Sequence, residues 1–263
     1  MSEFAEMLRV ETRKALRSQM PLWTALGSLF LPAGMAFLVF VARNPAISQK
    51  LGLMGAKANL VAYAGTDWPL YFTLFGQMAA AGGFILFVLS ASWVFGREFT
   101  DQTVKDLLAV PVSRSTLLLA KFIAVALWSA VLVILIYLTA LILGALIGLP
   151  QGSPDVLWQG SARFMITAGL VIVVLLPIPF FASIGRGYLL PTGAAVLLIL
   201  LANIVAVTGW GSYFPWAVPA LYSGAGGSQY GALEPISYVL ALLTGAAGIA
   251  GTYLWWRWAD QSR

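Results

Sequence analysis

Six apolar runs constrain what this chain can fold into more than any other feature. A transmembrane helix needs roughly 20 consecutive apolar residues, and hydropathy places six such runs at 22–41, 70–95, 117–147, 164–184, 188–207 and 236–258. Hydrophobic residues make up 60% of the chain and charged residues only 10%. No soluble core could hide that much apolar surface. The sequence therefore predicts an all-α membrane protein with six transmembrane helices, forming one transmembrane domain over residues 1–263.

The distribution of basic residues predicts the topology, because Lys and Arg in short flanking segments tend to stay on the cytoplasmic side. Eleven of the fifteen basic residues flank the side that carries both termini, and the other four flank the opposite side. Those four are Arg43, Lys50, Lys57 and Arg163. We therefore expect a multi-pass protein of the inner or plasma membrane with both termini cytoplasmic. The basic charges are scattered over several loops, which argues against nucleic acid as a partner.

Residues 1–20 are predicted to form an amphipathic helix on the membrane surface. Apolar side chains fall near one helical face, and basic side chains repeat every four residues along another. The apolar set is Phe4, Met7, Leu8 and Ala15, and the basic set is Arg9, Arg13 and Arg17. An ordinary cytoplasmic helix leading into the first span is the alternative.

Segments on the opposite side differ in character. Residues 43–69 form a mixed loop, and residues 148–162 are predicted to form a short turn rich in Gly and Pro. Residues 208–235 combine many aromatic rings with glycines and prolines. Such rings suit the membrane interface, either in a re-entrant pair of short helices or in a plain interfacial loop.

Proline and glycine within the apolar runs predict where helices bend or pack closely. Pro32 in the first run, and Pro177 with Pro179 in the fourth, leave backbone carbonyls without a partner and should kink those helices. Gly245 and Gly248 in the sixth run offer a small surface for contact with a neighbouring helix.

A polar segment at residues 97–114 interrupts the chain between the second and third runs. Thr103, Val104, Leu107 and Leu108 share one face of a short predicted helix, a pattern that favours docking of a protein partner. Pro111 should end that helix, and Ser113 is a good cap for the next one.

Arg97 and Glu98 precede that helix at the end of the second run. They point about 100 degrees apart on one helix, so we expect each to pair across an interface rather than with the other. Alternatively, both residues only mark the aqueous end of the span.

The string Arg-Glu at 97–98, followed by Thr-x-x-x-Leu-Leu-Ala-x-Pro-Val-Ser-Arg at 103–114, resembles the cytoplasmic coupling segment of type-two ABC exporter permeases, also called type V ABC transporters. The resemblance covers nearly the whole chain. It implies a cytoplasmic coupling helix seated on an ATPase, with coupling residues Arg97, Glu98, Asp101, Thr103, Val104, Leu107, Leu108, Pro111 and Arg114. Gln102 departs from the family, which commonly has Gly there. Because a helix tolerates Gln better than Gly, the change is expected to be harmless.

The resemblance also implies partners: two ATP-binding cassette subunits and a second permease, either identical or a paralogue. This chain has no Gly-x-x-x-x-Gly-Lys-Ser/Thr string, so ATP and Mg²⁺ are expected to bind the cassette subunits and this chain is not expected to be an enzyme or to hold a cofactor or metal of its own. The family's translocation path runs beside spans one, two and five. Thr73, Gln77 and Asn203 are candidate path residues, although hydrogen bonding between helices is the commoner use of such residues.

The predicted function is therefore that of a transmembrane permease subunit of an ABC exporter. A path with few charges favours a hydrophobic or amphiphilic cargo, such as a drug, an antimicrobial peptide or a lipid. The competing interpretation is a non-transporting membrane scaffold or immunity protein that docks a cytoplasmic partner through residues 97–114.

Overall fold

The computed structural model describes residues 3–44, 67–225 and 233–258. Across these ranges six helical segments are long and apolar enough to cross a membrane, which confirms the prediction of a helical protein with six spans. The segments are α2 (Met20–Arg43), α5 to α6 (Trp68–Thr100), α8 (Arg114–Ile147), α9 to α10 (Pro154–Ile184), α11 (Leu189–Val207) and α13 (Pro235–Trp258).

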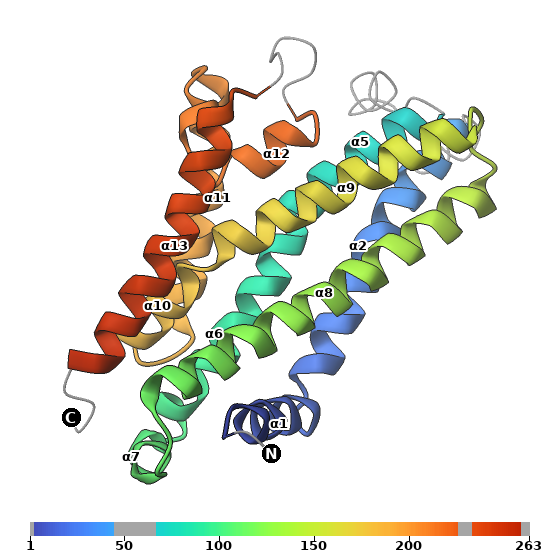
Figure 1. The fold of residues 1–263 in the computed structure, drawn as a ribbon. Coiled ribbons are helices and arrows are strands. Elements are labelled where there is room, and N and C mark those ends of the chain that lie inside the picture. The colour runs from blue at the N-terminus through green and yellow to red at the C-terminus, as the bar shows by residue number, and fades with distance from the viewer. Residues whose placement is uncertain (1–2, 45–66, 226–232, 259–263) are drawn as a thin grey trace.

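The shorter helices separate the two ends of the bundle. The N-terminal helix α1 (Glu3–Leu16) lies crosswise at one end, with α7 (Val104–Ala109) and the C-terminal end of α13 at the same end (Figure 1). We call this the α1/α7 end. The opposite end holds the start of α5 and the short helices η2 (Gly211–Tyr213) and α12 (Val218–Tyr222). The polar segment 97–114, the helix α1 and the last turn of α13 thus share one end of the bundle. That this end is cytoplasmic stays a prediction.

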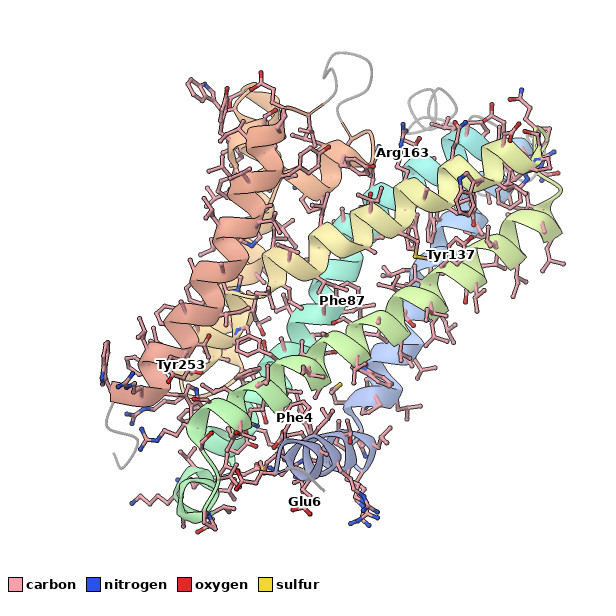
Figure 2. All side chains as sticks on the ribbon, in the orientation of Figure 1. Phe4, Glu6, Phe87, Tyr137, Arg163 and Tyr253 are labelled. Atoms are coloured by element: carbon pink, nitrogen blue, oxygen red, sulfur yellow. The ribbon has the colours of Figure 1, made fainter. Side chains whose placement is uncertain are left out.

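The apolar face of α1 packs on the protein itself. Met7 is buried, and Phe4 and Leu8 pack against the core through contacts of α1 with α8 and α2. Figure 2 shows Phe4 on the side of α1 that faces α8, with Glu6 on the opposite side. The apolar face predicted to lie on lipid is therefore covered by the bundle. The exposed face carries Arg9, Arg13 and Arg17.

Aromatic rings join α5, α8 and α9 in the core. Phe75 of α5 stacks on Phe164 of α9 with ring centroids 4.3 Å apart, and Tyr137 of α8 stacks on the same ring at 5.7 Å. The Tyr71 hydroxyl donates to the carbonyl of Ala140 at 3.0 Å. Buried rings supply large apolar area with a fixed geometry, so these contacts hold three spans in one arrangement.

The second span changes its helical form midway. α5 (Trp68–Met78) passes into the π-helix η1 (Ala79–Gly83) and then into α6 (Phe84–Thr100). A π-turn inserts an extra residue per turn and rotates the side chains that follow it. Beyond it α6 packs against α2, α8, α10 and α11, so the residues of α6 face neighbours on several sides.

The fourth span breaks at Leu176–Pro177, between α9 (Pro154–Leu175) and α10 (Ile178–Ile184), as the prolines predict. Pro177 cannot donate a backbone hydrogen bond. Nearby, the indole Nε1 of Trp216 donates to the Val174 carbonyl at 2.9 Å. Gly248 of α13 packs against this break, where an added Cβ would lie 2.5 Å from the Pro177 nitrogen. The predicted close approach at Gly248 is therefore confirmed.

The prediction of a turn over 148–162 is wrong. α9 already begins at Pro154, and the Ser153 hydroxyl accepts from the Val156 amide at 3.4 Å. A capping Ser followed by Pro at the first helical position is a helix start signal, although the same residues are also common in turns.

The segment 208–235 contains η2 and α12, with α12 packed against α9, α13 and α5. Its residues 226–232 lie outside the described ranges, as do Lys50 and Lys57. That this segment re-enters the bilayer stays a prediction.

The packing at the fourth-span break generates a stability prediction. Gly248→Ala places a methyl group against the backbone of Leu176 and Pro177, and overpacking of this kind costs about 1–3 kcal/mol. The melting temperature of the purified protein in detergent should fall. Gly169→Ala on α9 is the matched control, because no atom lies within 4 Å of its added Cβ. Equal melting temperatures for the two variants would contradict the packing.

Candidate coupling site

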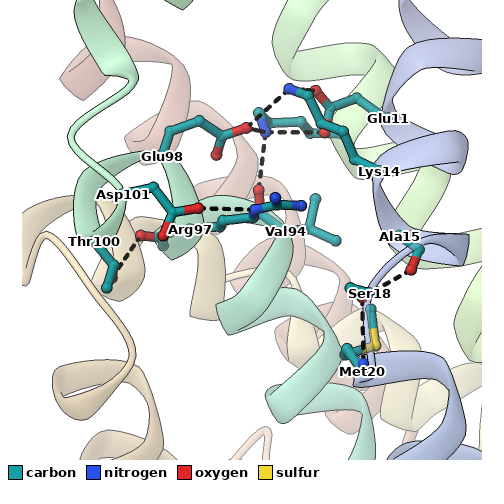
Figure 3. A network of polar contacts seen from close by, with 12 residues as sticks. Glu11, Lys14, Ala15, Ser18, Met20, Val94, Arg97, Glu98, Thr100 and Asp101 are labelled. Atoms are coloured by element: carbon teal, nitrogen blue, oxygen red, sulfur yellow. Dashed lines mark hydrogen bonds and ion pairs between the residues drawn. The ribbon is translucent and has the colours of Figure 1, made fainter.

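Four charged side chains meet at the α1/α7 end, where α1, α6 and α8 come together. Figure 3 shows Glu11 and Lys14 of α1 facing Glu98 of α6. The Lys121 ammonium of α8 donates to Glu98 Oε1 at 2.7 Å, to Glu11 Oε2 at 3.0 Å and to the Val94 carbonyl at 2.9 Å. Lys14 donates to Glu11 Oε1 at 3.0 Å and to Glu98 Oε1 at 3.3 Å. We call Glu11, Lys14, Glu98 and Lys121 the charge quartet.

The charge quartet is buried and electrically neutral. The Lys121 side chain is 0% exposed and both glutamates are nearly as buried, whereas Lys14 remains 31% exposed. Moving an isolated ion out of water costs several kcal/mol, so each of these charges depends on the others. Glu98 Oε2 has no hydrogen-bond partner among the described residues. A buried quartet of this kind fixes the relative positions of three helices.

The partners keep the α1 members charged. Burial raises the pKa of the Glu11 carboxyl, but Lys121 and Lys14 outweigh that effect and hold its pKa below the ordinary 4.5. Burial lowers the pKa of the Lys14 ammonium, but Glu11 and Glu98 reverse this and hold its pKa above 10.5. Glu11 and Lys14 therefore remain an ion pair at neutral pH.

Arg97 and Glu98 have different partners, as expected for adjacent residues of one helix. Arg97 lies on the exposed side, pairs with Asp101 at 3.0 Å and stacks over Trp93 at 4.9 Å. Glu98 points inward to the charge quartet. Glu98 thus pairs with two other helices, α1 and α8. The expectation that Arg97 also pairs across an interface is wrong, because Asp101 is the residue that caps its own helix.

Arg114 binds the last helix. Its Nη1 donates to the carbonyl of Trp256 at 2.6 Å and to that of Arg257 at 3.2 Å. These carbonyls end α13 and have no partner within it, so Arg114 caps α13 from the start of α8. Sequence spacing gave no hint of this contact.

The α7 helix presents a different face from the one predicted. Val104 is 5% exposed and Leu107 packs partly buried against the core, so the expectation that Val104 faces a partner is wrong. The turn through Thr103, whose amide donates to the Glu98 carbonyl at 2.8 Å, folds this apolar face back onto the bundle. The exposed residues of α7 and its flanks are Asp101, Gln102, Thr103, Lys105, Asp106, Ala109, Val110 and Pro111. The side chain of Leu108 lies outside the described ones.

Gln102 lies outside any helix. Its φ of +57° is left-handed, a conformation that costs a non-glycine residue about 1 kcal/mol. The sequence-based expectation was that Gln102 is harmless because a helix tolerates Gln. That reason is wrong, because Gln102 is not in a helix. Glycine is the residue that fits this position without strain.

A second group of predicted residues lies beside η1. Gln77 and Asn203 line one cavity of about 170 Å³ together with Ala80, Phe84 and Trp216. Asn203 Nδ2 donates to the Ile199 carbonyl at 2.8 Å. Thr73 lines a different pocket, with Gln159 and Arg163. The structure thus brings together two of the three candidate path residues.

Comparisons with known proteins identify the family. The model of the family described as "ABC-2 family transporter protein" matches residues 7–202. The chain belongs to this family. It is also 29% identical, over 181 residues, to the bacitracin transport permease protein BCRB of Bacillus licheniformis, an alignment that covers 68% of this chain and 85% of the relative.

The chain is therefore a multi-pass transmembrane permease subunit of an ABC exporter, as predicted. ATP hydrolysis belongs to a separate ATPase subunit, and the permease itself is not an enzyme. The family match favours transport over the scaffold or immunity interpretation.

Sequence reasoning missed three members of the permease's charge quartet: Glu11, Lys14 and Lys121. Lys121 was counted only as a positive flank of the third span. The available signal was its position inside an apolar run, because a lysine there requires a buried partner. Which carboxylates supply that partner depends on the packing of α1, which sequence spacing does not reveal.

Removing the central cation of the quartet should destabilise the permease. Lys121→Met leaves Glu11 and Glu98 buried without it, and breaking a buried pair on one side costs about 3–5 kcal/mol. Thermal unfolding in detergent should show a large fall in the melting temperature of Lys121→Met. Combining Lys121→Met with Glu98→Gln should restore part of that melting temperature. Arg97→Gln, which breaks an exposed pair, is the control and should cost less than about 1 kcal/mol. Equal losses in Lys121→Met and Arg97→Gln would refute this account.

The lowered pKa of Glu11 gives a pH dependence. Because its folded pKa lies below 4.5, ionised Glu11 stabilises the fold above pH 4.5 and loses this contribution as the pH falls through the folded value. The difference in melting temperature between the native chain and Glu11→Gln should be large at neutral pH and shrink in acid. Glu6→Gln, on the exposed face of α1, should show no such trend. A difference that grows in acid would contradict the stated sign.

Proposed function

We propose that this permease works as one half of a pair, with a second permease that is either identical or a paralogue. Each permease docks on an ATP-binding cassette subunit at the α1/α7 end. The bias of basic residues toward that end supports a cytoplasmic orientation for it, in the inner or plasma membrane. ATP and Mg²⁺ then bind the cassette subunits.

The observation that carries this proposal is the position of α7 outside the spans, at the end of the bundle (Figure 1). Its exposed surface combines Lys105 and Asp106 with Val110, which is 44% exposed. Mixed polar and apolar surface of this kind is typical of a transient protein interface. We assign the docking contact to this surface, in place of the Val104 face that the bundle covers.

The charge quartet gives the docking contact a route into the membrane. Glu98 ends the span before α7 and Lys121 lies in the span after it, and the two bind each other. Each also binds α1, Lys121 through Glu11 and Glu98 through Lys14. A displacement of α7 by the closing ATPase would therefore carry α1, α6 and α8 together rather than bending one loop.

The cargo path follows the surface of α2, α6 and α11, since α6 packs against both α2 and α11. The cavity at Gln77 and Asn203 lies between the second span and α11 and has a mostly apolar lining with two amides. Such a lining suits a hydrophobic or amphiphilic cargo: a drug, a lipid or an antimicrobial peptide. The similarity to a bacitracin transport permease supports a cargo of this class.

The docking surface can be tested by charge reversal. Lys105→Glu combined with Val110→Asp should lower the ATPase turnover of the complex reconstituted with its cassette subunit by about tenfold or more, because repulsive charge at an interface centre weakens docking. Co-purification of the cassette subunit should fall in parallel. The melting temperature of the isolated permease should stay unchanged, because these side chains are exposed.

Arg13→Glu is the matched control, because it reverses an exposed charge at the same end on α1. It should leave turnover close to native. Native turnover in the α7 variant would disprove the docking surface, and failure of any cassette subunit to bind the native chain would revive the scaffold interpretation.

A further inference from the structure

Arg163 occupies an unusual place on α9. It directly precedes the apolar run 164–184, whereas α9 itself already begins at Pro154. Hydropathy therefore places the hydrocarbon boundary near Arg163, for either topology. The side chain is exposed. Figure 2 shows it beside α5, at the end of the bundle opposite α1.

This guanidinium forms no ion pair or hydrogen bond with the described residues. The carboxylate of Asp67, the residue just before α5 at this end of the bundle, accepts from the Leu70 amide at 3.1 Å and caps α5. The stretches 45–66 and 226–232 contain no Asp or Glu in their sequence. Arg43 at the same end differs, because its Nη1 donates to the carbonyls of Ile147 and Gly148 at 2.8 Å and 3.0 Å. Arg163 is thus a cation at headgroup depth for which the described part of the chain provides no anion.

Arg163 lines an open pocket of about 150 Å³. Gln159 lies one turn before Arg163 on the same face of α9, and both line the pocket, with Phe72 and Thr73 of α5 opposite them. Gly160 lets the two helices approach closely, because any Cβ there would collide with the ring of Phe72. The pocket therefore combines two side chains that donate hydrogen bonds with an apolar wall.

We propose that this pocket binds the phosphate headgroup of an anionic membrane phospholipid. Arginine presents a planar fork of donors that matches phosphate oxygens, and the Gln159 amide adds a further donor. The ring of Phe72 suits the first carbons of the lipid below its phosphate. The proposal stands apart from the coupling proposal, since the pocket lies at the other end of the bundle from α7. It is also separate from the cargo cavity at Gln77 and Asn203, because the two share no lining residue.

Lipid titration of the intact chain tests the proposal. Native mass spectrometry of the protein released from detergent measures the Kd of each successive phosphatidylglycerol. Arg163→Gln should weaken the tightest step by about tenfold or more, as expected for loss of a charge-assisted hydrogen-bonding partner. Arg163→Lys keeps the positive charge but loses the planar pair of guanidinium donors. Its Kd should therefore lie between the Kd of the native chain and that of Arg163→Gln. Arg257→Gln removes an exposed charge at the α1/α7 end and should leave the tightest step unchanged.

Two further ligands separate the sources of binding. Diacylglycerol with the same chains should not compete with phosphatidylglycerol for the tightest step, and inorganic phosphate should compete only weakly. Equal competition by diacylglycerol would show that the headgroup is irrelevant and overturn the proposal. Equal competition by inorganic phosphate would overturn the assignment to a lipid. An unchanged Kd in Arg163→Gln, together with a native melting temperature, would show that this pocket is not the binding site.

Discussion

The burial of Lys121 determines how the α1/α7 end of this permease is built. A lysine with no exposed side-chain surface needs anionic partners, and it takes them from α1 and α6, Glu11 and Glu98. Lys14 then balances the charge from the solvent side. Buried ion pairs add little net stability compared with apolar packing. The value of this quartet is positional: α1, α6 and α8 fit together in one way, and α7 is attached to two of them.

The other constraints act at helix ends. Arg43 and Arg114 each donate to the terminal carbonyls of another helix, α8 and α13 respectively. Cations placed there also interact favourably with the negative end of the helix dipole. Gly248 packs against the break at Pro177, and Trp216 donates a hydrogen bond to the nearby carbonyl of Val174. The bundle is therefore fixed at both ends, while its irregular segments, η1 and the α9–α10 break, lie in the spans.

Much of the fold could be predicted because a helix that crosses a bilayer must be long and apolar. The six apolar runs of the sequence therefore predict six spans. The structure of short segments was harder to predict, because it depends on packing against the rest of the chain. The turn predicted for 148–162 is the start of α9, and the Val104 face predicted to dock a partner is buried against the bundle. The charge quartet could be predicted only in outline. A lysine within an apolar run signals a buried partner, but Glu11 becomes that partner only because α1 folds back across α8. Gln102 shows the same limit, because its left-handed backbone follows from how α6 ends.

The charge quartet joins α1, the C-terminal end of α6 and the N-terminal end of α8 into one rigid unit, which should move together with α7. The native chain has no cysteine, so in the double variant Arg13→Cys and Lys105→Cys spin labels attach to this chain only at those two positions. The distance between the two labels is then measured in the assembled complex, with and without ATP. The account predicts a narrow distance distribution that is preserved in both nucleotide states and broadens when Lys121 is replaced by Met. A distance that changes with ATP in the native quartet, or a distribution indifferent to Lys121, would contradict it.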